Sequence, residues 1–167
     1  MPEPLDRGLN IAILHITSCL FPKGFDVSPN APETYEALLA HIAETGRMCV
    51  WNGASENTIY ADRQVNYAFR AWHDWCHWFG HFDFSLGGER QACEMQKQHL
   101  RALYVGGKHL KRWEAILDAE VIGQAEYEAK HGEFPIDQRS FVQAYLWAHN
   151  ASALCWMKQD TGQHLVW

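Results

Sequence analysis

The sequence predicts an all-α fold, a compact bundle of about five to six helices that forms a single helical domain over residues 1–167. Apolar residues recur at the helical period in several segments, and short stretches rich in glycine and proline separate these segments. Apolar residues make up 47% of the chain and aromatic residues 13%, which excludes a disordered protein. The length is sufficient for one well-formed core.

The individual elements follow from their start and stop signals. Pro32 is typical of the first turn of a helix, and Gly46 is typical of its end. Residues 47–62 are predicted to form a loop or a short hairpin, because Asn52-Gly53 is a turn signal between short apolar segments. Four further helices are expected at residues 64–79, 89–104, 108–130 and 137–157.

Composition narrows the functional classes. The formal net charge of -6 gives no general attraction to nucleic acid or to anionic membranes. The apolar run from Leu9 to Phe21 is short for a membrane span and is interrupted by His15, and no basic segment precedes it as in a signal peptide. Five scattered cysteines without a Cys-x-x-Cys pair favour reduced thiols in the cytoplasm. Composition therefore favours neither a nucleic-acid nor a membrane partner, and a homo-oligomer stays open.

The helix expected at residues 64–79 contains the main candidate site. Spacings of four, three and four place one polar stripe on a single face, with Asp74 beside it: Asn66, Arg70, His73 and His77. The remaining positions are mostly aromatic, so the helix is expected to be buried, and polar groups on a buried helix need a partner. A buried cluster of ionisable groups indicates a metal or catalytic centre.

Other helices can supply that partner. Glu120, Gln124 and Tyr127 continue the apolar face of the helix at residues 108–130, where a carboxylate and an amide need an explanation. Histidine nitrogens and carboxylate oxygens together suit a divalent ion such as Mn, Zn, Fe or Co. The other candidates are Glu89 at the start of the helix at residues 89–104, Gln96 on the same side of that helix, and His41 on the first helix.

At His73-Asp74 the sequence resembles the HD-domain metal-dependent phosphohydrolases, in particular their deoxynucleotide triphosphohydrolase branch. The resemblance lies in the segments His73-Asp74, His77, Phe79-Gly80-His81 and Gly88-Glu89. The chain is also similar to small uncharacterised phage-encoded proteins that share its segments FRAWHDWCH, AEVIGQAEY and FPIDQ. This second resemblance implies no activity.

The resemblance to HD-domain enzymes implies a metal-dependent phosphohydrolase that acts on a nucleotide or a related phosphate ester or anhydride. The metal ligands it implies are His41, His73, Asp74 and a later acid, either Asp118 or Glu120, of which the helical stripe favours Glu120. Its catalytic residues would be His77, which protonates the leaving oxygen, and Glu89, which orients that oxygen or the water. The substrate contacts expected beside them are Asn66, Arg70, Gln124 and Tyr127.

Two other functional classes stay open. A ferritin-like carboxylate protein with two metal ions also uses inward-facing Glu and His residues, normally as Glu-x-x-His pairs on two helices. A non-enzymatic phage-type protein that binds a host factor or a small nucleotide would use a tryptophan-rich surface that includes Trp147, Trp156 and Trp167. The number and kind of metal ions per chain distinguish the ferritin-like class from a phosphohydrolase. Turnover of a phosphate substrate distinguishes a phosphohydrolase from the non-enzymatic binding protein.

Overall fold

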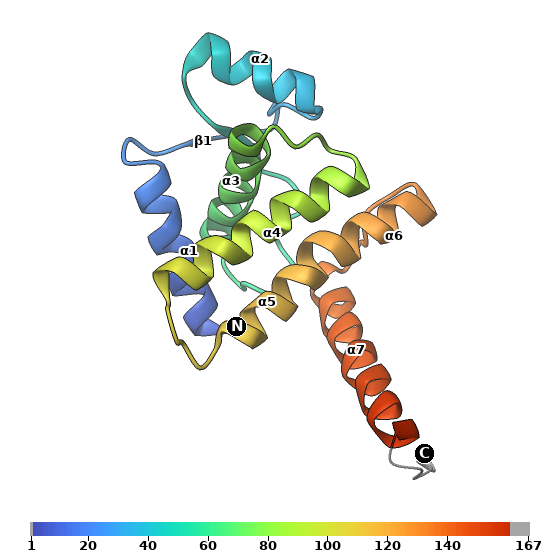
Figure 1. The fold of residues 1–167 in the computed structure, drawn as a ribbon. Coiled ribbons are helices and arrows are strands. Elements are labelled where there is room, and N and C mark those ends of the chain that lie inside the picture. The colour runs from blue at the N-terminus through green and yellow to red at the C-terminus, as the bar shows by residue number, and fades with distance from the viewer. Residues whose placement is uncertain (1, 161–167) are drawn as a thin grey trace.

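Helices make up most of the chain in the computed structural model, which describes the backbone of residues 2–160 and the side chains of residues 2–149 (Figure 1). The order of elements is α1 (Arg7–Leu20), β1 (Asp26–Ser28), α2 (Tyr35–Thr45), β2 (Cys49–Trp51), α3 (Arg63–Gly80), α4 (Leu86–Leu103), α5 (Leu110–Leu117), the π-helix η1 (Asp118–Gly123), α6 (Gln124–His131) and α7 (Gln138–Asp160). Since α5, η1 and α6 follow one another without a break, they form one rod, and the described residues contain six helices in this sense. The predicted all-α bundle is confirmed.

Helix α1 occupies the apolar run near the start of the chain. Asp6 caps it by accepting a hydrogen bond from the backbone amide of Leu9 at 2.9 Å. Leu9, Ile13 and Ile16 are buried in the main core, and the helix packs on α3. The run is therefore a core helix. Within the described residues, no helix combines the length and the apolar character that crossing a bilayer requires.

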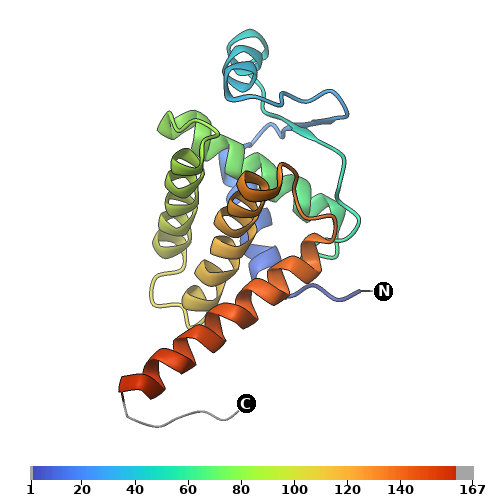
Figure 2. The same ribbon diagram turned by 90° about the vertical axis from the view of Figure 1, so that its right-hand side faces the viewer.

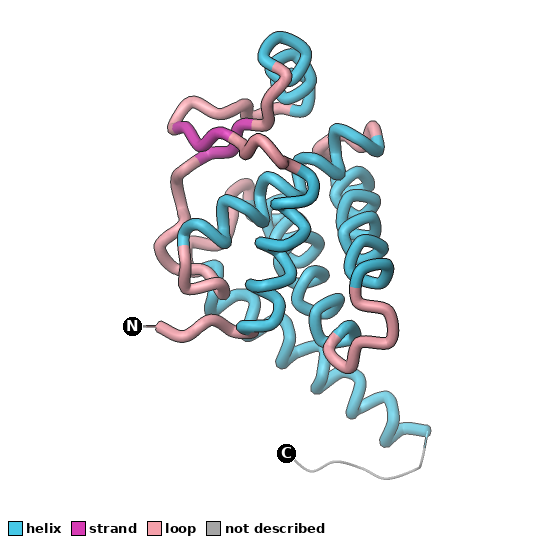
Figure 3. The backbone as a smooth tube through the Cα atoms, turned by 90° about the vertical axis from the view of Figure 1, so that its left-hand side faces the viewer, coloured by secondary structure: helices cyan, strands magenta, loops and turns pink. Residues whose placement is uncertain are grey.

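Of the two forms predicted for residues 47–62, a loop or a short hairpin, the structure has a loop that contains the short strand β2 rather than a hairpin. Strand β2 pairs with β1 in parallel, with Val50 opposite Val27 (Figure 3). Because α2 lies between the two strands in sequence, it forms the crossover that a parallel pair requires. The turn after β2 is held by Arg70, whose guanidinium donates to the carbonyl oxygens of Trp51 and Gly53 at 2.7 and 2.6 Å. These bonds from a side chain replace the returning strand of a hairpin.

Helix α4 begins at Leu86, earlier than the expected start near Glu89. Ser85 is its N-cap and accepts a hydrogen bond from the amide of Gly88 at 3.2 Å. Gly88 is buried, and a Cβ at this position would lie 1.8 Å from the backbone oxygen of Asp83. The glycine is thus required by a close approach of the preceding loop, and it belongs to the first helical turn, which also contains Glu89.

The main core lies between α1, α3, α4 and the rod. Trp72 on α3 is fully buried and belongs to the same cluster as Ile13, Leu100 and Ile116. Figures 1 and 2 show α2 and the strands at one end of this bundle, while α7 crosses the rod and projects beyond the other helices. The candidate site lies where α3, α4 and the rod converge.

Candidate metal centre

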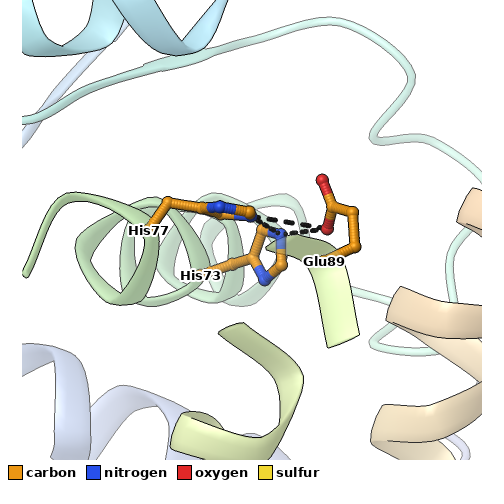
Figure 4. A group of neighbouring side chains, drawn as sticks. All are labelled: His73, His77 and Glu89. Carbon is orange, nitrogen blue, oxygen red and sulfur yellow. Dashed lines mark hydrogen bonds and ion pairs between the residues drawn. The ribbon is translucent and has the colours of Figure 1, made fainter. Parts of the chain in front are cut away.

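His73, His77 and Glu89 bring three ligand atoms together in one place (Figure 4). The two histidines lie one turn apart on the same face of α3, and Glu89 reaches them from the first turn of α4. His73 Nε2 lies 2.9 Å from Glu89 Oε2 and 3.0 Å from His77 Nε2, and His77 Nε2 lies 3.4 Å from Glu89 Oε2. We call these three residues the ligand triangle.

Both imidazoles are oriented by hydrogen bonds on their far side. His77 Nδ1–H donates to the backbone oxygen of Phe82 at 2.9 Å, and the amide of Phe82 donates back to the His77 carbonyl oxygen at 3.0 Å. His73 Nδ1–H donates to Oε1 of Gln96 at 3.0 Å, and the Gln96 side chain is fully buried. Outer partners of this kind fix the tautomer of a metal-binding histidine. Here they direct both Nε2 atoms into the triangle.

The dimensions of the triangle fit a small divalent ion. Ligands placed about 2.0–2.1 Å from a tetrahedral ion are separated from one another by roughly 3.3–3.4 Å. The edges of the triangle measure 2.9, 3.0 and 3.4 Å, so a small outward movement of the side chains makes room for an ion. Two histidines and one glutamate form a ligand set of catalytic zinc sites, which keep a fourth position for water or substrate.

The triangle contains a buried ion pair. Burial disfavours the His73 imidazolium, but the charge and hydrogen bond of Glu89 outweigh burial and raise the pKa of His73 to about 9. Burial also disfavours the Glu89 carboxylate, but the charge of His73 and the hydrogen bonds of both histidines lower the pKa of Glu89 to about 2. A proton therefore occupies the triangle at neutral pH. A metal ion must displace it, so metal binding is expected to release a proton.

A cavity of about 420 Å³ opens beside the triangle, and His73 and Glu89 form part of its lining. Apolar side chains such as Phe69 and Phe84 cover much of the wall. Among the described residues, no lysine or arginine lines the cavity, so its charge favours cations. Its five carboxyl groups are those of Glu33 and Glu128, which are exposed, and of Asp74, Glu89 and Glu120, which are partly or fully buried.

Asp74 and Glu120, both predicted as metal ligands, line this cavity but lie outside the ligand triangle. Burial raises the pKa of Asp74 to about 6, against the charges of His73 and His77. Burial also raises the pKa of Glu120 to about 7, against the hydrogen bonds that this carboxyl group accepts. Both residues therefore face the same space as the triangle without completing it.

The structure distinguishes the two acids that the sequence offered on the rod. Asp118 forms an ion pair with Lys97 at 2.5 Å and accepts a weak hydrogen bond from the thiol of Cys93. Glu120 lines the cavity and is 8% exposed. Glu120, which the helical stripe favoured as the later metal ligand, thus faces the cavity but lies outside the ligand triangle.

His41 lies outside the ligand triangle. It belongs to α2, and its backbone oxygen accepts a hydrogen bond from the hydroxyl of Thr45 at 2.8 Å. Its buried Nε2 has no hydrogen-bond partner among the described residues. The triangle instead contains His77 and Glu89, which the sequence analysis placed in catalytic roles.

The four expected substrate contacts are absent from the lining of the cavity within the described residues. Arg70 donates to the turn after β2, and Asn66 donates to Ser55 Oγ at 2.9 Å. Gln124 Nε2 donates to Glu120 Oε1 at 3.1 Å, and the ring of Tyr127 packs on aromatic neighbours in α6 and α7. The polar stripe of α3 is thus divided: its first half supports a loop, and its second half forms the triangle.

Several groups at the site had no signal in the sequence. The backbone oxygen of Phe82 orients His77, but any residue has such an oxygen. Tyr60 donates its hydroxyl to Glu120 from a segment predicted as a loop or a short hairpin. Glu33 reaches the cavity from the segment before α2 and Glu128 reaches it from α6, and both are ordinary surface glutamates in sequence.

Comparison with known proteins found no match to the chain among family models, curated proteins or solved structures. The functional argument therefore depends on the geometry of the site.

Proposed function

We propose that the protein is a metal-dependent phosphohydrolase that acts on a small nucleotide or a related phosphate ester or anhydride. The principal support is the ligand triangle, in which two oriented imidazole nitrogens and one carboxylate oxygen converge within 3.4 Å. A divalent ion held there lowers the pKa of bound water and polarises a phosphoryl oxygen. Zn, Mn, Fe and Co are all compatible with nitrogen and oxygen ligands, and the tetrahedral spacing favours zinc.

The cavity indicates how such a substrate would enter. A bare phosphate would be repelled by the ionised carboxylates of the cavity, whereas a phosphate chelated by its own divalent cation would be accepted. The volume of about 420 Å³ is within the range of small-molecule sites, and the apolar wall suits a base or another flat group. We therefore expect the magnesium complex of a nucleotide to be a better substrate than the free anion.

The two alternatives receive less support from the contacts. The triangle uses side chains from α3 and α4 only, whereas a ferritin-like centre draws carboxylates from four helices. For a non-enzymatic binding protein, Trp147 is an exposed aromatic group at 70% exposure, while Trp156 and Trp167 lie outside the residues with described side chains. The four described cysteines are free, in agreement with the cytoplasmic location that we propose.

The first experiment measures metal binding and turnover on the same preparations. Purified protein is analysed for metal content, then stripped with a chelator and titrated with Zn²⁺, Mn²⁺, Co²⁺ and Fe²⁺ by calorimetry. We expect one tight site per chain and metal-dependent release of phosphate from at least one member of a panel of dNTPs, NTPs, monophosphates and cyclic dinucleotides. Tight binding of a nucleotide that is recovered intact would instead favour the binding protein, and two irons per chain would favour the ferritin-like class.

Variants of the triangle connect the activity to the site. His73→Ala, His77→Ala and Glu89→Gln are each expected to lower metal affinity by roughly 100-fold or more and to remove turnover. The matched control is His81→Asn, because His81 is an exposed histidine in the left-handed C-cap of α3, a conformation that asparagine adopts readily. Folded triangle variants that keep full metal affinity would contradict the proposed centre.

A further inference from the structure

Glu120 lines the cavity from η1, whereas His73 and Glu89 line it from α3 and α4. Glu120 is nine-tenths buried, yet it lines the cavity together with His73 and Glu89. Its Oε2 accepts a hydrogen bond from the Tyr60 hydroxyl at 3.2 Å, and its Oε1 accepts one from Gln124 Nε2 at 3.1 Å. Both donors are neutral. Because each carboxylate oxygen can accept two hydrogen bonds, the group keeps capacity toward the cavity.

The backbone places Glu120 there through an irregular turn. Glu120 lies in the π-helix η1, between α5 and α6. Single turns of this kind inside an α-helix are rare and occur often at functional sites. Two residues earlier, Asp118 pairs with Lys97 of α4, so the charge of this lysine is already compensated. Glu120 forms no ion pair among the described residues.

The charged and titratable groups around Glu120 come from several elements. Tyr60 approaches from the loop before α3, Arg70 and Asp74 belong to α3, Glu89 to α4 and Glu128 to α6. The charge of Arg70 and the two neutral donors favour the carboxylate, whereas burial opposes it more strongly and raises the pKa of Glu120 to about 7. A carboxyl group with this pKa holds its proton near neutral pH and can also release it.

Resting on the phosphohydrolase activity proposed above, we infer that Glu120 is the catalytic general acid of the reaction, which protonates the leaving oxygen from the wall of the cavity formed by η1. A water oxygen forms the new bond to phosphorus and releases its proton to solvent, while the bond between phosphorus and the leaving oxygen breaks. The leaving oxygen keeps the electron pair and takes the proton of Glu120. The resulting carboxylate recovers a proton from solvent before the next turnover. Both nitrogens of His77 are engaged, Nδ1 by the backbone oxygen of Phe82 and Nε2 within the ligand triangle. We therefore assign this role to Glu120 and not to His77, where the sequence placed it.

The dependence on the leaving group tests this role, because a good leaving group needs no proton. We would compare wild-type protein and Glu120→Gln on an alkyl phosphate ester and on the corresponding 4-nitrophenyl ester, both loaded with the same metal. The variant is expected to lose about 10²–10³-fold in kcat on the alkyl ester and less than about fivefold on the 4-nitrophenyl ester. Its alkaline decline in kcat/KM is expected to disappear. Metal affinity should stay within about twofold of wild type.

Each other outcome overturns the inference in a recognisable way. An equal loss on both esters would make Glu120 a structural residue, and a tenfold or larger loss of metal affinity would make it a ligand. Glu126→Gln is the control, because Glu126 is an exposed glutamate on the adjoining helix that pairs with Arg90 away from the cavity. If metal-loaded wild-type protein hydrolyses neither ester nor any nucleotide, the phosphohydrolase proposal fails and the acid role fails with it. That result is distinct from a loss confined to Glu120→Gln.

Discussion

The two walls of the cavity shift the pKa values of their glutamates in opposite directions. On the wall formed by α3 and α4, Glu89 faces two histidines, and their charge and hydrogen bonds lower its pKa to about 2. On the wall formed by η1, Glu120 faces a tyrosine hydroxyl and a glutamine amide, and burial raises its pKa to about 7. The two carboxyl groups line the same space. The difference therefore comes from their immediate partners.

This contrast indicates different roles for the two glutamates. A carboxylate that is ionised at every working pH, beside two oriented imidazole nitrogens, suits a cation. A carboxyl group that holds a proton near neutral pH, supported only by neutral donors, suits proton transfer. The following predictions test the contrast, from the largest expected effect to the smallest.

Removing the hydrogen bond that orients His73, on the wall formed by α3 and α4, should weaken metal binding most. Gln96→Leu deletes the acceptor of the His73 Nδ1–H bond and leaves the imidazole free to turn. We expect metal affinity, measured by calorimetry, to fall about 10–100-fold. Gln98→Leu is the matched control, since Gln98 is an exposed glutamine on the same helix. Equal affinity in Gln96→Leu and wild type would show that the triangle orients itself without Gln96.

The second wall should make stability depend on pH. A glutamic acid in the unfolded chain loses its proton near pH 4.5, whereas folded Glu120 holds it to about pH 7. The folded state thus binds more protons in this window, so the free energy of unfolding falls as pH rises from about 4.5 to 7. Glu120→Gln should remove this loss, which is on the order of 2 kcal/mol.

Urea denaturation of metal-free protein at pH 5 and pH 8 measures this difference. Wild type should lose more stability between the two pH values than Glu120→Gln does, and Glu126→Gln should behave as wild type because its side chain is exposed. Parallel behaviour of wild type and Glu120→Gln would mean that Glu120 is ionised in the folded protein at pH 5.

A smaller effect on stability is expected from removing the hydrogen bond that Tyr60 donates to Glu120. Tyr60→Phe removes a hydrogen bond that favours the carboxylate, so the pKa of Glu120 should rise further. We expect a loss of about 1 kcal/mol in the free energy of unfolding at pH 8 and a smaller loss at pH 5. Tyr67→Phe is the matched control, because the hydroxyl of Tyr67 donates to the backbone oxygen of Asn52. Its effect should be independent of pH between 5 and 8.

The smallest effect is expected outside both walls. Arg90 and Glu126 form an ion pair between half-exposed side chains. Arg90→Gln should change the free energy of unfolding by less than about 0.5 kcal/mol, and the change should shrink further in high salt. A larger change, measured by the same denaturation curves, would mean that the α4–α6 contact is coupled to the cavity.

Much of the fold and part of the site were predictable from local sequence. The helix expected at residues 64–79 is α3 (Arg63–Gly80), because periodic apolar residues, an acidic cap and a terminal glycine are local signals. His73 and His77 share a face of that helix because they are one turn apart. Their need for a partner also followed, since the rest of the helix is aromatic and buried.

What those side chains meet was decided by tertiary structure. Whether His73 bonds with adjacent Asp74 or with distant Glu89 depends on how α4 crosses α3, and a loop folded tightly against Gly88 sets that crossing. The π-helix alters the rotation of the rod at residue 118, so a helical period of 3.6 cannot assign the directions of Asp118 and Glu120. Arg70 supports the turn after β2 although it lies on the same stripe as the histidines. Helical periodicity determines which side chains share a face, because it depends on neighbours in sequence. Only the packing of distant segments determines what each part of that face contacts.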